Sequence, residues 1–221
     1  RKYRTPQACT RAGRGGSNVV DAASCQGLLA PERTMLGAGQ LAWLRAGLAS
    51  SRGRWNLIAQ HSIMAQVDRR PGPGRDAWTD SWDGYPAERR ALLEHMAARK
   101  TANPVVLGGD VHMFFVNDLK ADFDDAKAPV LATEFVGTSI SSQASAQEAV
   151  NRLLPDNPQV RSPPASTVAI PAWNLRRKNC RWICAPWKPC NAAMPTARHL
   201  RASWWKTAGQ ARNAPDAKRD A

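Results

Sequence analysis

The sequence predicts a mixed α/β (α+β) fold, in which strands and helices pack in layers around one core. Two short apolar runs, residues 55–60 and 105–107, have the length of buried strands. Two longer segments, residues 35–51 and 86–100, carry apolar side chains at helical spacing. Because strands and helices alternate over a chain of 221 residues, layered packing around one core is the simplest expectation.

The first third of the chain is predicted to run from a loop into a helix and then into a strand. Residues 1–33 are polar, rich in Gly and interrupted by Pro, which is typical of a long surface loop. Within residues 35–51, Leu recurs at i, i+3 and i+7, so one face of a helix is apolar. Residues 55–60 then form a short strand that ends at His61.

The middle of the chain is predicted to pass through a loop and a helix into a buried strand. Residues 68–84 are dense in Gly, Pro, Asp and Trp, which is typical of a loop. Pro86 suits the first position of a helix, and we expect that helix to continue to about Lys100. The strand at residues 105–107 is followed by two glycines and then by polar residues, so it presents polar side chains at its C-terminal end.

Two more strands and a short helix complete the predicted domain. Residues 114–119 and 130–136 form the strands, and an acidic turn at residues 122–127 separates them. Residues 145–154 form the helix, which Pro155 stops. The predicted domain therefore covers residues 1–160.

The composition changes sharply at about residue 160. Residues 161–221 hold 12 of the 31 Lys and Arg but two of the 18 Asp and Glu. They also hold five of the nine Trp and three of the five Cys. The formal net charge of +13 therefore describes mainly this tail, and a nucleic-acid partner inferred from the total charge would be unsafe.

Asp110 and His112 form the first candidate metal site. They lie two residues apart at the expected end of a strand, so an extended backbone would point both side chains toward one face. A carboxylate beside an imidazole can hold a hard or a borderline cation. A GDxH tetrapeptide is not specific, however, and the alternative is that Asp110 caps a turn while His112 is half-buried and hydrogen-bonded.

Five sequence blocks in a fixed order carry a resemblance to a known family. The blocks are LGAGQLAWL, WNLIAQHSIM, DSWDGYPAERR, VVLGGDVH and TEFVGTSISS. Together they resemble the alkaline phosphatase D (PhoD) family of metallophosphatases, over roughly residues 3–160. The resemblance implies a partial calcineurin-like metallophosphoesterase sandwich, in which two β-sheets are flanked by helices.

The resemblance also implies a reaction and its cofactors. The reaction is metal-dependent hydrolysis of phosphate monoesters, and often of diesters, at alkaline pH, so the implied partners are small phosphate esters. Two or more metal ions are implied, with Fe(III) and Ca(II) typical of the family. Asp110 resembles the calcium-side carboxylate and His112 the iron-side imidazole. The implied mechanism is in-line attack on phosphorus by an activated hydroxide, with the metals neutralising phosphoryl charge.

His61 is the candidate catalytic residue. It ends a strand, and the sequence departs there from the resembled family, many members of which have Gln or Asn. One interpretation is that it contacts a metal or the phosphate. The alternative is a buried, hydrogen-bonded histidine. Glu134 is interpreted as a hydrogen-bond partner at a strand end rather than as a ligand.

Trp82, Tyr85 and Arg89 match a WDGYxxxR block of the family and are the candidate substrate-binding residues. The alternative that we favour is a turn and helix start, in which Asp83 caps, Tyr85 packs and Arg89 pairs with a carboxylate.

The same resemblance implies that the other metal ligands come from an N-terminal half that this chain lacks. We therefore expect the fragment to be inactive, or nearly so, on its own. A periplasmic or secreted location is implied for the full-length protein, and we expect a monomer. No apolar run is long enough to cross a bilayer. In an exported protein Cys9 and Cys25 could pair, but their spacing leaves this open.

Residues 161–221 admit three interpretations. They could form a basic, Trp-rich arm that binds nucleic acid, in which case the protein is a non-catalytic binding module. Their Cys and His spacing fits no tight zinc site. The interpretation that explains most is translation in a shifted reading frame, because back-translation read one base later restores alternating strands and an ending that resembles this family. We then expect the tail to be disordered.

Overall fold

The computed structural model describes most of the chain up to residue 186. The described residues are 5, 8–9, 19–139, 142, 147–165, 169–176 and 179–186. The chain divides into two units, Arg1–Val168 and Ala169–Ala221.

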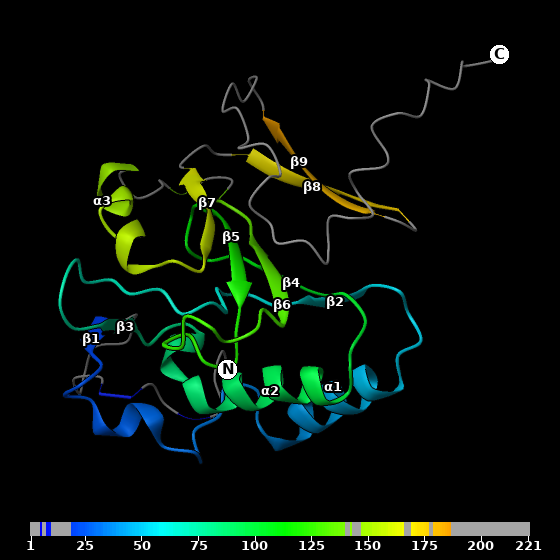
Figure 1. Ribbon diagram of the computed structural model, residues 1–221, viewed down its shortest axis with the longest axis horizontal. Helices are drawn as coiled ribbons and strands as arrows, with labels where there is room; N and C mark the ends of the chain where they lie inside the picture. The colour runs from blue at the N-terminus through cyan, green and yellow to red at the C-terminus, as the bar shows by residue number, and fades with distance from the viewer. Residues whose placement is uncertain are drawn as a thin grey trace. The chain divides into compact units, whose positions relative to one another are not determined.

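A five-stranded sheet forms the centre of the first unit (Figure 1). Its strand order is β2-β4-β6-β5-β7. β2 (Asn56–Ala59), β4 (Pro104–Gly108) and β6 (Ala132–Val136) are parallel neighbours. β5 (Phe114–Leu119) and β7 (Val160–Ala165) continue the sheet with antiparallel pairs. Because β2, β4 and β6 run in one direction, their carboxyl ends lie at one edge of the sheet.

Two long helices run side by side next to the sheet (Figure 1). α1 (Ala38–Ser50) and α2 (Pro86–Ala98) begin and end within three residues of the predicted bounds. α2 buries Leu92, Leu93 and Met96 in the same core that holds the alternating apolar side chains of the sheet. Each fully buried side chain of this size contributes about 2 kcal/mol of hydrophobic stabilisation. Pro86 occupies the first turn of α2, as predicted.

Short elements replace two segments that were predicted to be loops. Residues 19–21 and 76–78 form β1 (Val19–Asp21) and β3 (Asp76–Trp78), an antiparallel pair. The remaining short turns are 3₁₀ helices, namely η1 (Gln26–Leu29), η2 (Trp82–Gly84) and η3 (Leu154–Asp156). The loop predictions for residues 19–21 and 76–78 are wrong, because three paired residues give no periodicity that a sequence can show.

A disulfide joins Cys9 to Cys25, so the pairing that the sequence left open is present in the structure. Thr5 is also tied to the rest of the unit. It exchanges hydrogen bonds with Thr34, and the Tyr85 hydroxyl donates to the carbonyl of Thr5 over 2.7 Å. Tyr85 therefore contacts Thr5.

The end of the first unit differs from the predicted boundary at residue 160. β7 begins at Val160 and pairs with β5, and α3 (Gln147–Asn151) precedes it. The first unit thus extends to Val168. In the second unit, β8 (Ala169–Arg176) and β9 (Asn179–Pro186) form an antiparallel pair within the tail that was expected to lack regular structure. The origin of the tail in a shifted reading frame stays a prediction, and residues 187–221 lie outside the described residues.

None of the helices that the structure describes is both long and apolar enough to cross a membrane. The mixed α/β fold class is confirmed, with two sheets and flanking helices in the first unit.

Candidate functional site

The candidate site lies at the carboxyl edge of the three parallel strands. Hydrogen bonds tie the residues that follow β2 and β6 to the end of β4. The Gln60 amide after β2 donates to the carbonyl of Leu107 over 3.0 Å, and the Gly137 amide after β6 donates to the carbonyl of Gly108 over 2.9 Å. In open sheets with parallel strands, ligands bind outside the carboxyl ends of the strands. His61, Asp110 and His112 follow β2 and β4, so they lie at an edge that suits a ligand.

Asp110 and His112 follow β4 in this edge, but the backbone that carries them is not extended. Both residues have positive φ angles, 74° for Asp110 and 57° for His112. The prediction that an extended backbone points the two side chains to one face is wrong, because β4 ends at Gly108 and the chain then turns. Left-handed backbone is costly for most residues and is frequent at functional sites.

The Asp110–His112 turn is accessible and tied to the next loop. Asp110 is exposed and His112 is partly exposed. The Thr138 hydroxyl donates a hydrogen bond to the carbonyl of His112 over 2.9 Å. The turn after β4 is thus connected to the segment after β6, and both of its candidate ligands lie at the surface of this edge.

Gly108 is required by close packing rather than by a special backbone angle. A Cβ atom at this position would lie 2.5 Å from the carbonyl oxygen of Ser62 and 3.1 Å from Oε1 of Glu134. Both distances are shorter than ordinary contacts. Gly109 has more room, since its Cβ would lie 3.6 Å from the carbonyl oxygen of His61. The loop after β2 therefore packs directly on the turn that leads to Asp110.

His61 lies in that loop, immediately after the carboxyl end of β2. Its side chain is exposed, so the alternative of a buried histidine is wrong. The close approach of its carbonyl to Gly109 places the His61 backbone beside the Asp110–His112 turn. The three candidate residues thus belong to two loops that touch. Whether His61 contacts a metal or a phosphate stays a prediction.

Trp82, Tyr85 and Arg89 are buried, with exposed fractions of 2%, 0% and 3%. Side chains that are closed off from solvent do not reach a dissolved substrate, so the direct-contact prediction gains no support from this arrangement. Their contacts are structural instead. Trp82 donates from its indole nitrogen to Oε1 of Gln60 over 3.2 Å, which links the block to the residue before His61.

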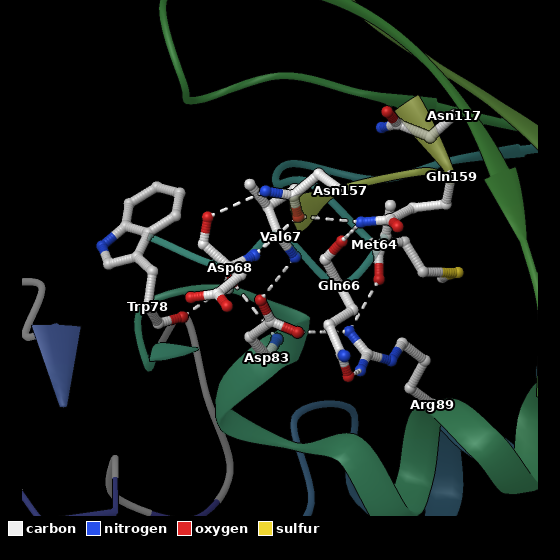
Figure 2. Close-up of polar contacts among 12 residues, drawn as sticks. Met64, Gln66, Val67, Asp68, Trp78, Asp83, Arg89, Asn117, Asn157 and Gln159 are labelled. Carbon is white, nitrogen blue, oxygen red and sulfur yellow. Dashed lines mark hydrogen bonds and ion pairs between the residues drawn. The ribbon is translucent and has the colours of Figure 1, made fainter. Parts of the chain in front are cut away.

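Arg89 pairs with a carboxylate, as the favoured interpretation predicts. Figure 2 shows its guanidinium facing Asp83, with an N–O distance of 2.6 Å. The same group donates to the carbonyl of Met64 over 3.1 Å and to Oε1 of Gln66 over 3.3 Å. The cap of η2, however, is the side chain of Ser81, so the capping role predicted for Asp83 is wrong. Asp83 instead accepts a hydrogen bond from a loop amide.

Side chains from outside the loop bind most of the backbone amides that follow His61. We call residues 61–67 the β2 loop. The bonds are Ser62 N to Gln60 Oε1 (2.9 Å), Met64 N to Glu134 Oε1 (2.5 Å), Ala65 N to Glu134 Oε2 (2.9 Å) and Val67 N to Asp83 Oδ2 (3.0 Å). Glu134 is thus a hydrogen-bond partner, as interpreted from the sequence. Sequence reasoning missed which amides it binds, because Glu134 is far from the β2 loop along the chain.

Burial shifts two pKa values around the site. Glu134 is fully buried in β6, and burial raises the pKa of its carboxyl from 4.5 to about 7, against the opposing effect of its hydrogen bonds from Asn117, Ala65 and Met64. Burial likewise raises the pKa of Tyr85 to about 12.

The donor types at the edge fit metal ions, but their number is small. Asp110 offers carboxylate oxygens and His112 offers an imidazole nitrogen, which suit a hard and a borderline cation. Among the residues that the structure describes, no three or more His, Cys, Asp or Glu side chains form a group that could hold a metal ion. Two donors do not fill the coordination sphere of one such ion, so further donors are needed.

Comparisons with known proteins agree with the sequence blocks. Residues 1–174 match the sequence model of a family described as PhoD-like phosphatase. Alkaline phosphatase D of Bacillus subtilis (strain 168) is 35% identical over 134 residues, which are 59% of this chain and 23% of that protein. A solved structure of PhoD aligns with a TM-score of 0.62 and 33% identity, covering 73% of this chain and 30% of its own. The chain thus spans less than a third of the relatives that it matches.

Proposed function

The chain belongs to the PhoD-like phosphatase family, and we propose from this premise that it carries part of a metal-dependent site that hydrolyses phosphate esters. The observation that supports the proposal is the meeting of two loops at the carboxyl edge of β2 and β4, one with His61 and the other with Asp110 and His112. The substrates are small phosphate monoesters or diesters.

Asp110 and His112 are the proposed metal ligands. Asp110 would hold Ca(II) through its carboxylate, and His112 would hold Fe(III) through its imidazole. The chemistry that such ions supply is neutralisation of charge on phosphoryl oxygens and activation of a water nucleophile. No side-chain nucleophile is then required.

His61 is proposed to contact the phosphate of the substrate. Its side chain is exposed at the same edge, and the N–H of an imidazole donates a hydrogen bond to an anionic oxygen. Trp82 and Arg89 act indirectly in this proposal, because they bind Gln60 and the carbonyl of Met64, which lie on either side of His61 in the sequence. Tyr85 has a packing role through its bond to Thr5.

We expect this chain alone to turn over substrate weakly or not at all. The described residues offer two donors, whereas two metal ions bound in protein sites take more ligands than that. The relatives are three to four times longer than the matched part, so the additional ligands are proposed to lie in sequence that corresponds to the rest of those proteins.

A periplasmic or secreted location of the full-length protein is proposed from the disulfide between Cys9 and Cys25. Disulfides persist in oxidising compartments and are rare in the cytosol. Because residues 5 and 8–9 are tied by this bond and by Thr34 and Tyr85, the link is part of the folded first unit.

The metal proposal is tested by calorimetric titration of the 221-residue chain with Ca²⁺. Asp110→Asn keeps the left-handed backbone, which Asn tolerates, and removes the charge. We expect it to weaken Ca²⁺ binding at least about tenfold, since the loss of a charged ligand costs more than 1.4 kcal/mol.

Asp124→Asn is the matched control, because Asp124 is exposed and accepts one hydrogen bond from Gln66. It should bind Ca²⁺ as the unmodified chain does. Equal Ca²⁺ affinity in the unmodified chain and in Asp110→Asn would refute the proposed ligand role of Asp110.

A further inference from the structure

Glu134 is the most deeply buried acid in the described structure that the proposed mechanism does not use. It lies in the middle of β6, between β4 and β5, and its exposed fraction is 0%. Both carboxylate oxygens accept hydrogen bonds. Oε1 binds the amide of Met64, and Oε2 binds the amide of Ala65 and the side-chain amide of Asn117.

Two of these bonds reach consecutive amides of the β2 loop, which comes from another part of the chain. Met64 and Ala65 are 70 and 69 residues away from Glu134 along the sequence. A carboxyl group that binds two adjacent amides fixes both the position and the orientation of that backbone, because two hydrogen bonds to one buried group hold it at two points. Asn117, paired with Glu134 across β5 and β6, steadies the second oxygen.

Glu134 also lies against the turn after β4. Its Oε1 atom is 3.1 Å from the point where a Cβ atom of Gly108 would stand. The carbonyl of Ser62, in the β2 loop, is closer still to that point. The carboxylate therefore occupies the place where the β2 loop meets the strand end that leads to Asp110 and His112.

A buried carboxylate at such a position is costly unless it is bonded. Burial of a charge without partners is unfavourable by several kcal/mol, and an apolar side chain in the middle of a sheet carries no such cost. Packing alone therefore does not explain a glutamate here. The three hydrogen bonds of Glu134 explain it, and two of them bind backbone amides of the loop that carries His61.

We propose that Glu134 is a positioning residue, whose buried carboxylate binds the amides of Met64 and Ala65 and so holds the loop carrying His61 against the Gly108–Gly109 turn that carries Asp110 and His112. The relevance of Glu134 to catalysis rests on the proposed function. The claim that Glu134 holds the β2 loop does not depend on that function, so the loop contact and the function can be tested separately.

The test compares Glu134→Gln with the matched control Glu148→Gln, since Glu148 is exposed on α3. Hydrogen–deuterium exchange is followed in three segments of the full chain. These are residues 60–68, residues 107–113 and, as an internal reference, residues 86–98 of α2. Glutamine has the shape of glutamate, but its NH₂ group is a donor. It therefore cannot accept the hydrogen bond that one of the two loop amides gives to glutamate. We expect exchange in the first two segments to accelerate at least about tenfold, with α2 unchanged.

A spectroscopic measurement reads the site directly. The ring Hε1 resonances of His61 and His112 should shift in Glu134→Gln, while that of His95 on α2 should stay in place. Glu148→Gln should move none of them. If Glu134→Gln does not fold, Asn117→Ala removes one of the three bonds and should give the same pattern at a smaller size.

Unchanged exchange in residues 60–68 or 107–113, an equal acceleration in all three segments, or unmoved resonances of His61 and His112 would each overturn the proposal. Ca²⁺ binding to the unmodified chain is measured separately by calorimetric titration. A failure of Ca²⁺ binding there would count against the proposed function alone, because the exchange and NMR readouts need no metal.

Discussion

The loop after β2 and the turn after β4 meet at one edge of the sheet, but different interactions hold them. The β2 loop has ordinary backbone angles, and buried side chains from β6, η2 and α2 bind its amides and carbonyls. The turn after β4 has two left-handed non-glycine residues, Asp110 and His112, whose side chains lie toward solvent. Buried side chains from other elements therefore hold the β2 loop, whereas the turn after β4 is distinguished by its left-handed backbone.

The difference predicts where changes act. Substitutions far from the edge should disturb His61 through the buried partners of the β2 loop. Changes to Asp110 should alter ligand chemistry while leaving stability almost unchanged, because its side chain is exposed. Three experiments sharpen or break this contrast, and they follow in order of expected effect.

Arg89→Ala should be the most destabilising change. Arg89 is buried, and its removal leaves the carboxylate of Asp83 buried without its cation, as well as the carbonyl of Met64 without its donor. Breaking a buried pair in this way costs about 3–5 kcal/mol of unfolding free energy. Urea unfolding followed by tryptophan fluorescence measures it.

Arg90→Ala is the control for this substitution. Arg90 is the next residue of α2, and its pair with Asp122 is exposed, with an N–O distance of 3.2 Å. Exposed pairs contribute about 1 kcal/mol or less. Equal losses in the two variants would mean that the buried partners do not stabilise the β2 loop more than a surface pair does.

The pH dependence of stability should report Glu134. Its folded-state pKa of about 7 lies above the ordinary value of 4.5, so the folded protein binds more protons than the unfolded chain between these two values. The free energy of unfolding should therefore fall as the pH rises from about 4.5 to about 7 and then level off. The size of this decrease is about 3 kcal/mol.

Glu134→Gln has no such titration, so the difference in unfolding free energy between the unmodified chain and this variant should shrink over the same pH range. Chemical unfolding at several pH values measures the difference. A difference that stays constant from pH 4.5 to pH 8 would show that the carboxyl of Glu134 titrates alike in the folded and unfolded states.

Asp110→Gly should have the smallest effect on stability and a large effect on Ca²⁺ affinity. At the φ angle of 74° that Asp110 adopts, a residue with a side chain is strained and glycine is not. The free energy of unfolding should therefore rise by up to about 1 kcal/mol or stay unchanged. Calorimetric titration should show that Ca²⁺ binding is weakened. A loss of stability above about 2 kcal/mol would mean that the Asp110 side chain supports the turn.

Particular elements show how far sequence reasoning reached. The helices at α1 and α2 and the strands β2, β4, β5 and β6 were predicted because each shows local periodicity or a short apolar run. The β1–β3 pair was missed, since its partners are short and distant in sequence. The backbone of Asp110 and His112 was predicted as extended and is left-handed, because β4 ends at Gly108 and the chain then turns.

The sequence by itself determined the fold class, the order of the elements and the residue types that make a metal–phosphate site plausible, because these depend on local patterns and on short motifs. Only the tertiary structure decided which of those residues share an edge, that Trp82, Tyr85 and Arg89 are buried, and that Glu134 binds the loop after β2. The physical reason is that such contacts join residues many positions apart. Their formation depends on how strands align in the sheet and on which polar groups must be satisfied once they are buried.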